Sequence, residues 1–267
     1  MKAIRLPILP LLMLSILLMT MGFLSFRNAR SAAIQAAVAS FSAASFKAPV
    51  TGNSIIAAFG EKLASRTEVA ATLPLPISLA GTTVRVNGQP APLFFVSPGQ
   101  INYLMPPGIM PGAATVQVNS GDGDVSNGTV LVSPVAPGLF SFSADGQGLA
   151  AGFALRVRAN GSRVNEPIAD CGPGGCRPVP IDLSFSSEEV FLILYGTGIR
   201  GNSGLSATRA SIGGEPVEVL YAGPQPSLAG LDQINLRLPR GLRGRGMANI
   251  VFTGEGQPSN TVQVAIK

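Results

Sequence analysis

Histidine and tryptophan are absent from the chain, and only 12% of its 267 residues are charged. The absence of histidine excludes Ser-His-Asp and Cys-His nucleophilic sites, together with every histidine-containing zinc site. With two cysteines in the whole chain, a four-cysteine zinc site is excluded as well. Hydrolysis by a pair of carboxylates is the catalytic chemistry that we keep as an alternative.

Glycine and proline are abundant by contrast, with 32 and 22 residues, and 46% of the chain is hydrophobic. This composition favours many short strands joined by turns over long helices, and it supplies enough apolar material for a packed core. A length of 267 residues allows two small domains or one large one. The chain is therefore predicted to be an ordered β-protein.

One segment occurs twice in loosely similar form, first at residues 84–106 and again at 210–224 and 232–239, where seven residues are inserted. In the first copy Val84 and Val86 alternate with Thr83 and Arg85, which is the pattern of a half-buried strand. Asn87-Gly88 in the first copy and Gly213-Gly214 in the second both tolerate the positive φ of a tight hairpin turn. Each copy is therefore predicted to be a hairpin followed by a third strand.

The third strand of each copy opens with the same three residues, Gln100-Ile101-Asn102 and Gln233-Ile234-Asn235. Alternation along a strand places isoleucine on one face, and glutamine and asparagine on the other. With isoleucine toward the core, the two amides are free to bond backbone groups in the Gly/Pro break just before them. We therefore predict that these residues are structural, with Asn102 and Asn235 acting as clamps rather than as ligand contacts.

Further motifs follow in order along the chain: residues 90–96 before the first Gln-Ile-Asn, then Tyr195-Gly196-Thr197-Gly198-Ile199-Arg200, Val219-Leu220-Tyr221-Ala222-Gly223, Gly230-Leu231-Asp232 and Ser259-Asn260-Thr261-Val262. With these motifs, residues 45–267 resemble the uncharacterised C-terminal domain family of acidobacterial (Solibacter-type) secreted proteins. The resemblance implies Ig-like, IPT/TIG-like β-modules on exported proteins, often at the end of something larger. It implies no catalytic residues, so none is carried over.

The amino-terminal residues have the pattern of an export segment. Lys2 and Arg5 precede an apolar run over residues 6–24, and Arg27 and Arg30 follow it. A positive region before an apolar region is typical of a secretory signal, although 19 apolar residues are also nearly enough to span a bilayer. We therefore predict that residues 1–31 are a signal peptide or a membrane-anchor helix. Either alternative exports the rest of the chain to the periplasm, the cell surface or the extracellular space.

The formal net charge of +5 comes mostly from this leader. Four of the 19 basic residues lie within it and all 14 acidic residues follow it, which leaves 15 basic against 14 acidic residues beyond it. One local cluster, Arg237, Arg240, Arg243 and Arg245, is interleaved with glycine and lacks aromatic residues for base stacking. We predict a solvated loop there and no nucleic-acid partner. Membrane contact is predicted only through the N-terminal segment, if that segment stays uncleaved.

The remaining chain divides into a linker and two β-domains. Residues 32–46 are rich in serine and alanine and are predicted to be the linker. Residues 47–134 and 135–267 each offer about six or seven short strands around one copy of the repeat, which is typical of an Ig-like sandwich. The predicted fold is therefore all-β, with two tandem Ig-like β-sandwiches and a hairpin-and-loop insert at residues 150–183 of the second.

Cys171 and Cys176 lie in that insert, within a Gly/Pro-rich tip that we expect to be neither helix nor strand. In an exported protein such a pair is best explained as a short disulfide. The loop-entropy relation gives so small a ring about 2 kcal/mol. Two free thiols are the alternative, because local closure adds little to a core formed elsewhere.

Sites for metals and sugars find little support in the sequence. Residues 122–128 begin like a calcium loop, but position six is Asn127 and no glutamate falls at position twelve. A polar turn is predicted instead, and we expect no metal and no cofactor. Tyr103, Tyr195 and Tyr221 lie in apolar strand patterns, which favour core packing over a sugar-binding platform.

The leading hypothesis is an exported, non-enzymatic structural or interaction protein, adhesion-like, with an unknown extracellular or envelope partner. One alternative is an extracellular hydrolase that uses two carboxylates, with Glu166, Asp170 and Asp182 of the insert region as candidates. Glu188 and Glu189 are adjacent before a strand, so they are predicted to point to opposite faces and not to form a glycosidase pair. A carbohydrate-binding module is the other alternative.

Overall fold

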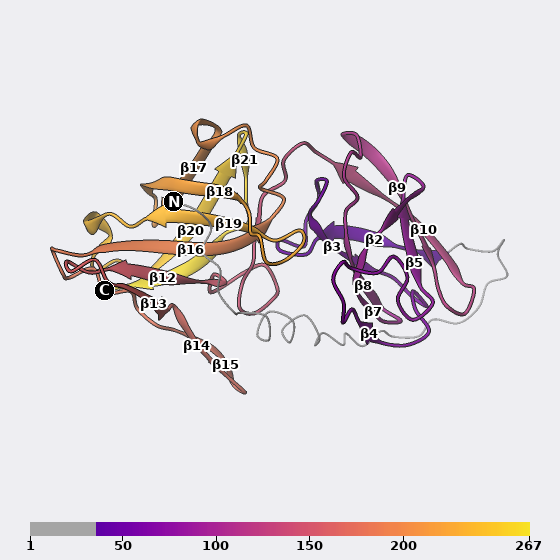
Figure 1. Cartoon of the computed structure of the whole chain (residues 1–267), viewed down its shortest axis with the longest axis horizontal. Coiled ribbons are helices and arrows are strands. Elements are labelled where there is room, and N and C mark those ends of the chain that lie inside the picture. Colours follow the sequence, from indigo (N-terminus) through magenta and orange to yellow (C-terminus); the bar gives the residue numbers. More distant parts are fainter. Residues whose placement is uncertain (1–35) are drawn as a thin grey trace.

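The structure, a computed structural model, describes residues 36–267. The predicted leader, residues 1–31, lies outside the described residues. The described chain forms two β-sandwiches, and its helical turns are the short 3-10 segments η1 (Leu205–Ala207) and η2 (Arg240–Leu242). Figure 1 shows the two sandwiches arranged end to end along the long axis of the molecule. The predicted all-β fold with two tandem sandwiches is confirmed. Over residues 36–267, no helix has the length and apolar character of a membrane span.

The first sandwich consists of two five-stranded sheets. One has the order β1 (Ala36–Ala37), β10 (Val125–Val132), β9 (Gly112–Asn119), β5 (Thr83–Val86) and β6 (Gln89–Ala91). The other has the order β2 (Ala39–Ser42), β3 (Ile55–Phe59), β8 (Gln100–Leu104), β7 (Leu93–Val96) and β4 (Glu68–Val69). Their shared core includes Ile56, Val84, Ile101, Tyr103 and Val116, all at most 1% exposed.

The predicted linker is wrong in its described part, because residues 39–42 form strand β2 and pair with β3. The small side chains of this stretch are typical of a linker, but here they allow close packing against neighbouring strands. At Gly128 an added Cβ would lie 1.9 Å from the carbonyl oxygen of Val38, so only glycine fits. Ser40 is buried, and its hydroxyl accepts a 3.2 Å hydrogen bond from the Tyr103 hydroxyl. The first sandwich therefore begins before residue 47.

The second sandwich is built around the long strand β16 (Glu189–Thr197). Its first sheet has the order β13 (Arg163–Pro167), β12 (Gly152–Val157), β16, β19 (Asp232–Arg237) and β18 (Glu215–Pro224), and β11 (Gly138–Leu139) also pairs with β16. β18 continues into a second sheet with β17 (Thr208–Ile212), β20 (Gly246–Gly254), β21 (Gln257–Pro258) and β22 (Val262–Ile266). Leu192, Ile234, Ile250, Phe252 and Val264 are completely buried in the core between these sheets.

Both predicted hairpins turn where the sequence indicates. Asn87 and Gly88 have φ values of 47° and 78° between β5 and β6, and Gly213 and Gly214 have values of 58° and 81° between β17 and β18. Positive φ at both central residues is what a type I′ turn requires. The first turn is also tied to β9, because the Thr115 N–H donates a 2.8 Å hydrogen bond to Asn87 Oδ1.

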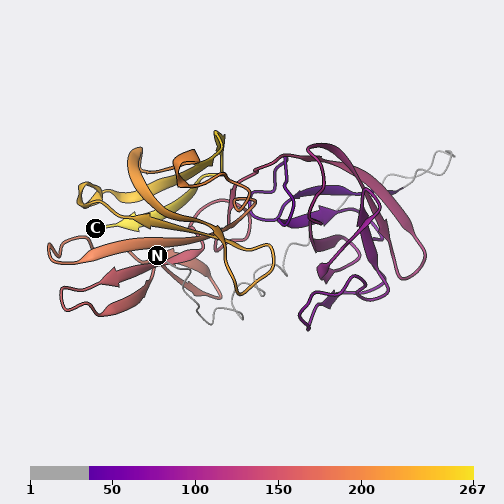
Figure 2. The ribbon, with the colours of Figure 1, turned by 45° about the horizontal axis from the view of Figure 1, so that its top comes forward.

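A third apolar cluster belongs to neither sandwich core. It includes Ile55 and Phe94 of the first sandwich together with Tyr195 and Leu231 of the second. The two bodies come very close at Gly230, where an added Cβ would lie 2.7 Å from Ile55 Cγ1. Gly230 belongs to the seven-residue insertion of the second repeat. That insertion therefore packs against the first sandwich. In the turned view of Figure 2 the two sandwiches again lie end to end.

Candidate functional site

The glutamine and asparagine of each Gln-Ile-Asn motif form an amide pair on the face of the sheet that points away from the sandwich core. Both isoleucines are completely buried in a sandwich core, as predicted. The amides bond each other and not the backbone of the preceding break, so that part of the prediction is wrong. Gln100 Nε2 donates to Asn102 Oδ1 at 2.9 Å, and Gln233 Nε2 donates to Asn235 Oδ1 at 2.7 Å. Residues i and i+2 share a face about 7 Å apart along a strand, within reach of these two side chains.

The second amide pair is more deeply buried than the first. Gln233 and Asn235 are 1% and 0% exposed, whereas Gln100 is half-buried. Among residues 36–267, Gln233 Oε1 and Asn235 Nδ2 have no hydrogen-bond partner. A buried polar atom without a partner disfavours folding, so this pair is only partly satisfied. The role of Asn235 as a structural clamp stays a prediction that substitution at Asn235 tests.

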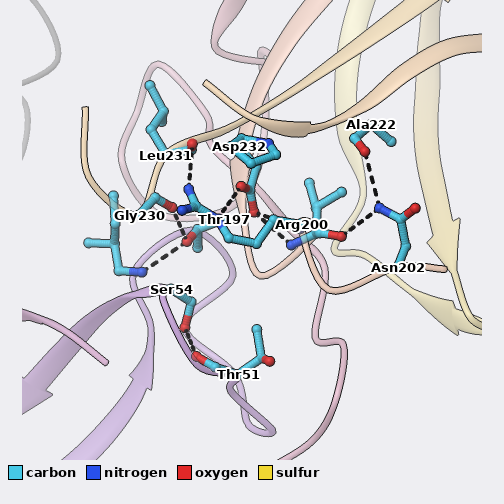
Figure 3. A network of polar contacts seen from close by, with 12 residues as sticks. Thr51, Ser54, Thr197, Arg200, Asn202, Ala222, Gly230, Leu231 and Asp232 are labelled. Atoms are coloured by element: carbon cyan, nitrogen blue, oxygen red, sulfur yellow. Dashed lines mark hydrogen bonds and ion pairs between the residues drawn. The ribbon is translucent and has the colours of Figure 1, made fainter. Parts of the chain in front are cut away.

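A more complete polar network surrounds Asp232, directly before the second motif (Figure 3). Its carboxylate accepts hydrogen bonds from the Ile199 N–H at 2.7 Å, from Arg200 Nε at 2.7 Å and from the Arg200 N–H at 3.2 Å. Arg200 Nη2 also donates to the Leu231 carbonyl at 2.7 Å. The Asp232 side chain is 0% exposed. Burial raises the pKa of Asp232, and Arg200 and the backbone N–H groups oppose this rise. The network fixes the turn after β16 onto the start of β19.

Thr197, the last residue of β16, links the two sandwiches (Figure 3). Its hydroxyl donates to the Gly230 carbonyl at 2.7 Å and accepts from the Ile55 N–H at 2.9 Å. Ile55 opens β3 of the first sandwich, so one side chain holds three segments that are far apart in sequence. Nearby, the Thr51 hydroxyl donates to the Pro134 carbonyl at 2.9 Å. We call this contact region, formed by Thr51, Ile55, Pro134, Thr197 and Gly230, the joint.

The residues of the joint and of the Asp232 network were not among the predicted site residues. Thr197 and Arg200 fall in the 195–200 motif, and Asp232 falls in the 230–235 motif, so only the family resemblance marked these positions. Their bonds connect residues 31 to 142 positions apart. Hydrophobic periodicity and turn chemistry concern neighbours in the chain, and they do not predict such distant contacts.

The structure joins Cys171 and Cys176 in a disulfide. The expectation of an irregular tip is wrong, because β14 (Ala169–Gly172) and β15 (Gly175–Pro178) form an antiparallel ladder in which the two cysteines are paired. Gly175 has a φ of 98°, which suits the tight turn between them. The hairpin extends away from both sheets of the second sandwich (Figure 1) and pairs with no other strand that the structure describes.

Arg156 gathers two acidic residues in the second sandwich. Its side chain is 6% exposed, and its Nε and Nη2 atoms donate to the Glu166 carboxylate at 2.6 and 2.9 Å. Its Nη1 atom donates to Glu188 at 3.0 Å. The hydrogen bonds to Glu166 raise the pKa of Arg156. Glu189 pairs instead with Arg237, so Glu188 and Glu189 diverge as the sequence predicts.

The other two carboxylates proposed for a hydrolase have separate partners. Asp182 accepts a 2.9 Å hydrogen bond from the Ser184 N–H and lies 3.4 Å from Lys267 Nζ. Hydrogen bonds from Ser184 and the nearby Lys267 lower the pKa of Asp182 to about 2. Asp170 lies on the hairpin, opposite Arg177. Arg156 Nη2 donates to the Glu166 carboxylate and, at 2.8 Å, to the Asp182 carbonyl, so these two residues meet at Arg156 through one carboxylate and one backbone oxygen. Asp170 is not part of this contact, and no group of three potential metal ligands occurs among residues 36–267.

Comparison with known proteins gives no family assignment. No family model and no curated protein matches the chain, so the acidobacterial resemblance stays a prediction. One similar solved structure is the SGBP-B protein of the Bacteroides ovatus mixed-linkage glucan utilization locus in complex with a mixed-linkage heptasaccharide, at 12% identity over 82% of this chain and 43% of that chain, with a TM-score of 0.32. Another is the full extracellular region of Plexin A4, at 9% identity over 85% of this chain and 18% of that chain, with a TM-score of 0.24. The chain spans less than half the length of either structure, and neither similarity bears on its function.

Proposed function

We propose that this protein is an exported, non-enzymatic interaction protein of the adhesion-like kind, and that the β14–β15 hairpin contacts its partner. The observation that carries the proposal is the hairpin itself. It lies outside both sandwiches, pairs with no other described strand, and is cross-linked between Cys171 and Cys176. The acidobacterial resemblance supports the same proposal, because it implies β-modules on secreted proteins.

The disulfide shapes a surface segment and adds nothing to a core. An isolated two-stranded hairpin is marginally stable in water, and most residues of this one are exposed. A cross-link between paired positions restricts the conformations open to the arm. A segment already held in its bound shape loses less entropy on binding. Asp170 and Arg177 stand opposite each other on the ladder, so the arm offers both charges to a polar protein surface.

The charged groups of the second sandwich support binding over hydrolysis. Arg156 is committed to Glu166 and Glu188, and Arg200 to Asp232. A general acid needs a pKa near the working pH and access to its substrate. Asp182, with a pKa of about 2, is poorly suited to that role.

Site-specific photo-crosslinking tests the proposal in cells that export the full chain. A photoreactive amino acid at Pro173, in the hairpin tip, is expected to give a discrete adduct that mass spectrometry identifies as one envelope or extracellular protein. The matched control position is Asn160, in the exposed turn between β12 and β13. Equal adducts from both positions, or none from Pro173, would reject the hairpin as the contact element.

A further inference from the structure

A cavity of about 400 Å³ opens in the second sandwich at the end opposite the joint. It lies where β16 begins, at Glu189, and where β19 ends, at Arg237, whereas Thr197 at the other end of β16 bonds the first sandwich. We call it the distal cavity; its lining includes Phe185, Ser186, Ser187, Glu189, Arg237 and Arg240. Loops at one end of an Ig-like sandwich are a common place for binding sites. The volume falls within the range of small-molecule sites.

Phe185 gives the distal cavity an exposed aromatic ring. It is 57% exposed and is the one aromatic residue among the large apolar side chains left exposed in the described chain. The guanidinium carbon of Arg156 lies 6.0 Å from the ring centroid, a distance suited to a cation–π contact. Arg156 is itself fixed by Glu166 and Glu188. The ring therefore stands beside a fixed cation while much of its surface stays open to solvent.

Arg240 is a cation of the cavity that forms no ion pair within the described chain, because the two glutamates in the lining, Glu188 and Glu189, pair with Arg156 and Arg237. Its Nη2 atom donates to the carbonyl oxygens of Ser186 and of Glu188, the latter at 3.3 Å. By contrast, Arg237 forms ion pairs with Glu189 and Glu218. Over residues 36–267, Arg240 forms no ion pair with a carboxylate. The backbone bonds thus hold its guanidinium at the cavity, where its remaining N–H groups can bind an anion.

We propose that the distal cavity binds an acidic saccharide, a uronate-containing oligosaccharide. One face of the pyranose ring packs on Phe185, and its carboxylate binds Arg240. The hydroxyl groups of Ser186 and Ser187 have no side-chain hydrogen bond within the described structure and are available to the sugar hydroxyls. An exposed aromatic ring, a guanidinium outside any ion pair and two small hydroxyls match the apolar ring face, the carboxylate and the hydroxyl groups of a uronate. The site is separate from the β14–β15 hairpin and does not depend on its role.

Calorimetric titration of the exported chain with oligogalacturonate and with its methyl ester tests the proposal, because esterification replaces each carboxylate by an uncharged methyl ester and leaves the sugar ring and its hydroxyl groups unchanged. The acid form is expected to bind, and the ester at least about tenfold more weakly, since a hydrogen bond to a charged group is lost. Phe185→Ala and Arg240→Gln should each weaken binding of the acid form by about tenfold. Arg243→Gln changes an exposed arginine of the same loop that does not line the cavity, so it should leave the affinity unchanged.

Three results would overturn the proposal. The first is an absence of binding to both oligogalacturonate and alginate oligosaccharides at millimolar concentration. The second is an equal loss of affinity in Arg243→Gln and Arg240→Gln, which indicates general charge attraction. The third is unchanged binding in Phe185→Ala. Because Arg240→Gln also removes bonds to two backbone carbonyls, saturation transfer between the sugar protons and the Phe185 ring in the unaltered chain serves as an independent measurement. An absence of transfer there rejects the site even if the variant is unstable.

Discussion

Asn235 is completely buried, yet only part of its amide is hydrogen-bonded. Its Oδ1 atom accepts from Gln233, while its Nδ2 atom and Gln233 Oε1 lack partners within the described chain. Asn235→Ala removes the one bond of the pair and leaves the Gln233 amide buried alone. We expect a loss of about 1–3 kcal/mol in the free energy of unfolding, measured by denaturant titration.

The double variant Gln233→Leu/Asn235→Leu distinguishes the free-energy cost of burying unpaired amide groups from the contribution of side-chain packing. Replacing both partners by apolar groups of similar shape can be nearly neutral, so it should be more stable than Asn235→Ala. Asn165→Ala, on the exposed edge strand β13, is the control and should change stability little. If Asn235→Ala melts like the unaltered chain but no longer binds an identified partner, the motif is a ligand site and the clamp interpretation is wrong.

We expect Asp145, in the loop after β11, to make the stability of the fold depend on pH. Partial burial raises its pKa, but hydrogen bonds from Ser143, the Gln147 N–H and Ser141 outweigh this and hold the pKa below the usual 3.8. A carboxyl group with a depressed folded-state pKa stabilises the fold above its unfolded pKa, and this contribution disappears as pH falls through the folded value.

The unaltered chain should therefore be more stable than Asp145→Asn at pH 6, and the difference should shrink as pH falls from about 4 toward 3. Thermal unfolding of both proteins across this range measures the effect. Asp122→Asn, in an exposed turn, controls for the loss of one negative charge. A difference that stays constant down to pH 3 would show that the carboxylate itself contributes nothing.

At the level of elements, the sequence predicted those strands whose signals are local. Asn87-Gly88 and Gly213-Gly214 determine a backbone conformation by themselves, and both turns form with positive φ. Strand β2 was missed because Ala and Ser carry no strand signal, and its place depends on pairing with β3. The β14–β15 ladder was missed for a similar reason, since glycine and proline are unfavourable in strands and the pairing is enforced at Cys171 and Cys176.

The hairpin should respond to loss of its disulfide without affecting the sandwiches. In Cys171→Ser/Cys176→Ser the arm loses a constraint of about 2 kcal/mol, and the amides of Asp170 and Arg177 should exchange hydrogen faster. The melting temperature of the whole chain should stay within about 2 °C, because the arm packs in neither core. Hydrogen exchange and calorimetry measure the two effects. A large fall in melting temperature would mean that the arm supports the fold and is not a separate surface element.

At the level of the whole molecule, the relation between the two sandwiches could not be predicted from the sequence. The amide pairs lie two residues apart, within the range of strand periodicity, whereas Thr197 bonds Ile55 across 142 positions. From the sequence alone, the insertion at residues 225–231 indicates only an additional loop in the second repeat. Its contact with Ile55 through Gly230 depends on how two complete sandwiches pack. Such contacts appear only once the fold has placed both partners.

Thr197→Val should weaken the joint without changing the volume of the side chain much. The substitution removes the acceptor of the Ile55 N–H and the donor to the Gly230 carbonyl, and each buried group left unpaired costs about 1–3 kcal/mol. Neither sandwich core loses a residue, since Thr197 belongs to neither cluster. We therefore expect calorimetry to show a first transition at a lower temperature and a separation of the two sandwiches into distinct unfolding steps.

Small-angle scattering of the same variant should show a broader distribution of end-to-end lengths. Thr129→Val, at an exposed position of β10, should change neither measurement. If Thr197→Val still unfolds in one step at the original temperature, the apolar cluster around Ile55 and Leu231 holds the sandwiches together by itself, and the hydroxyl of Thr197 is dispensable.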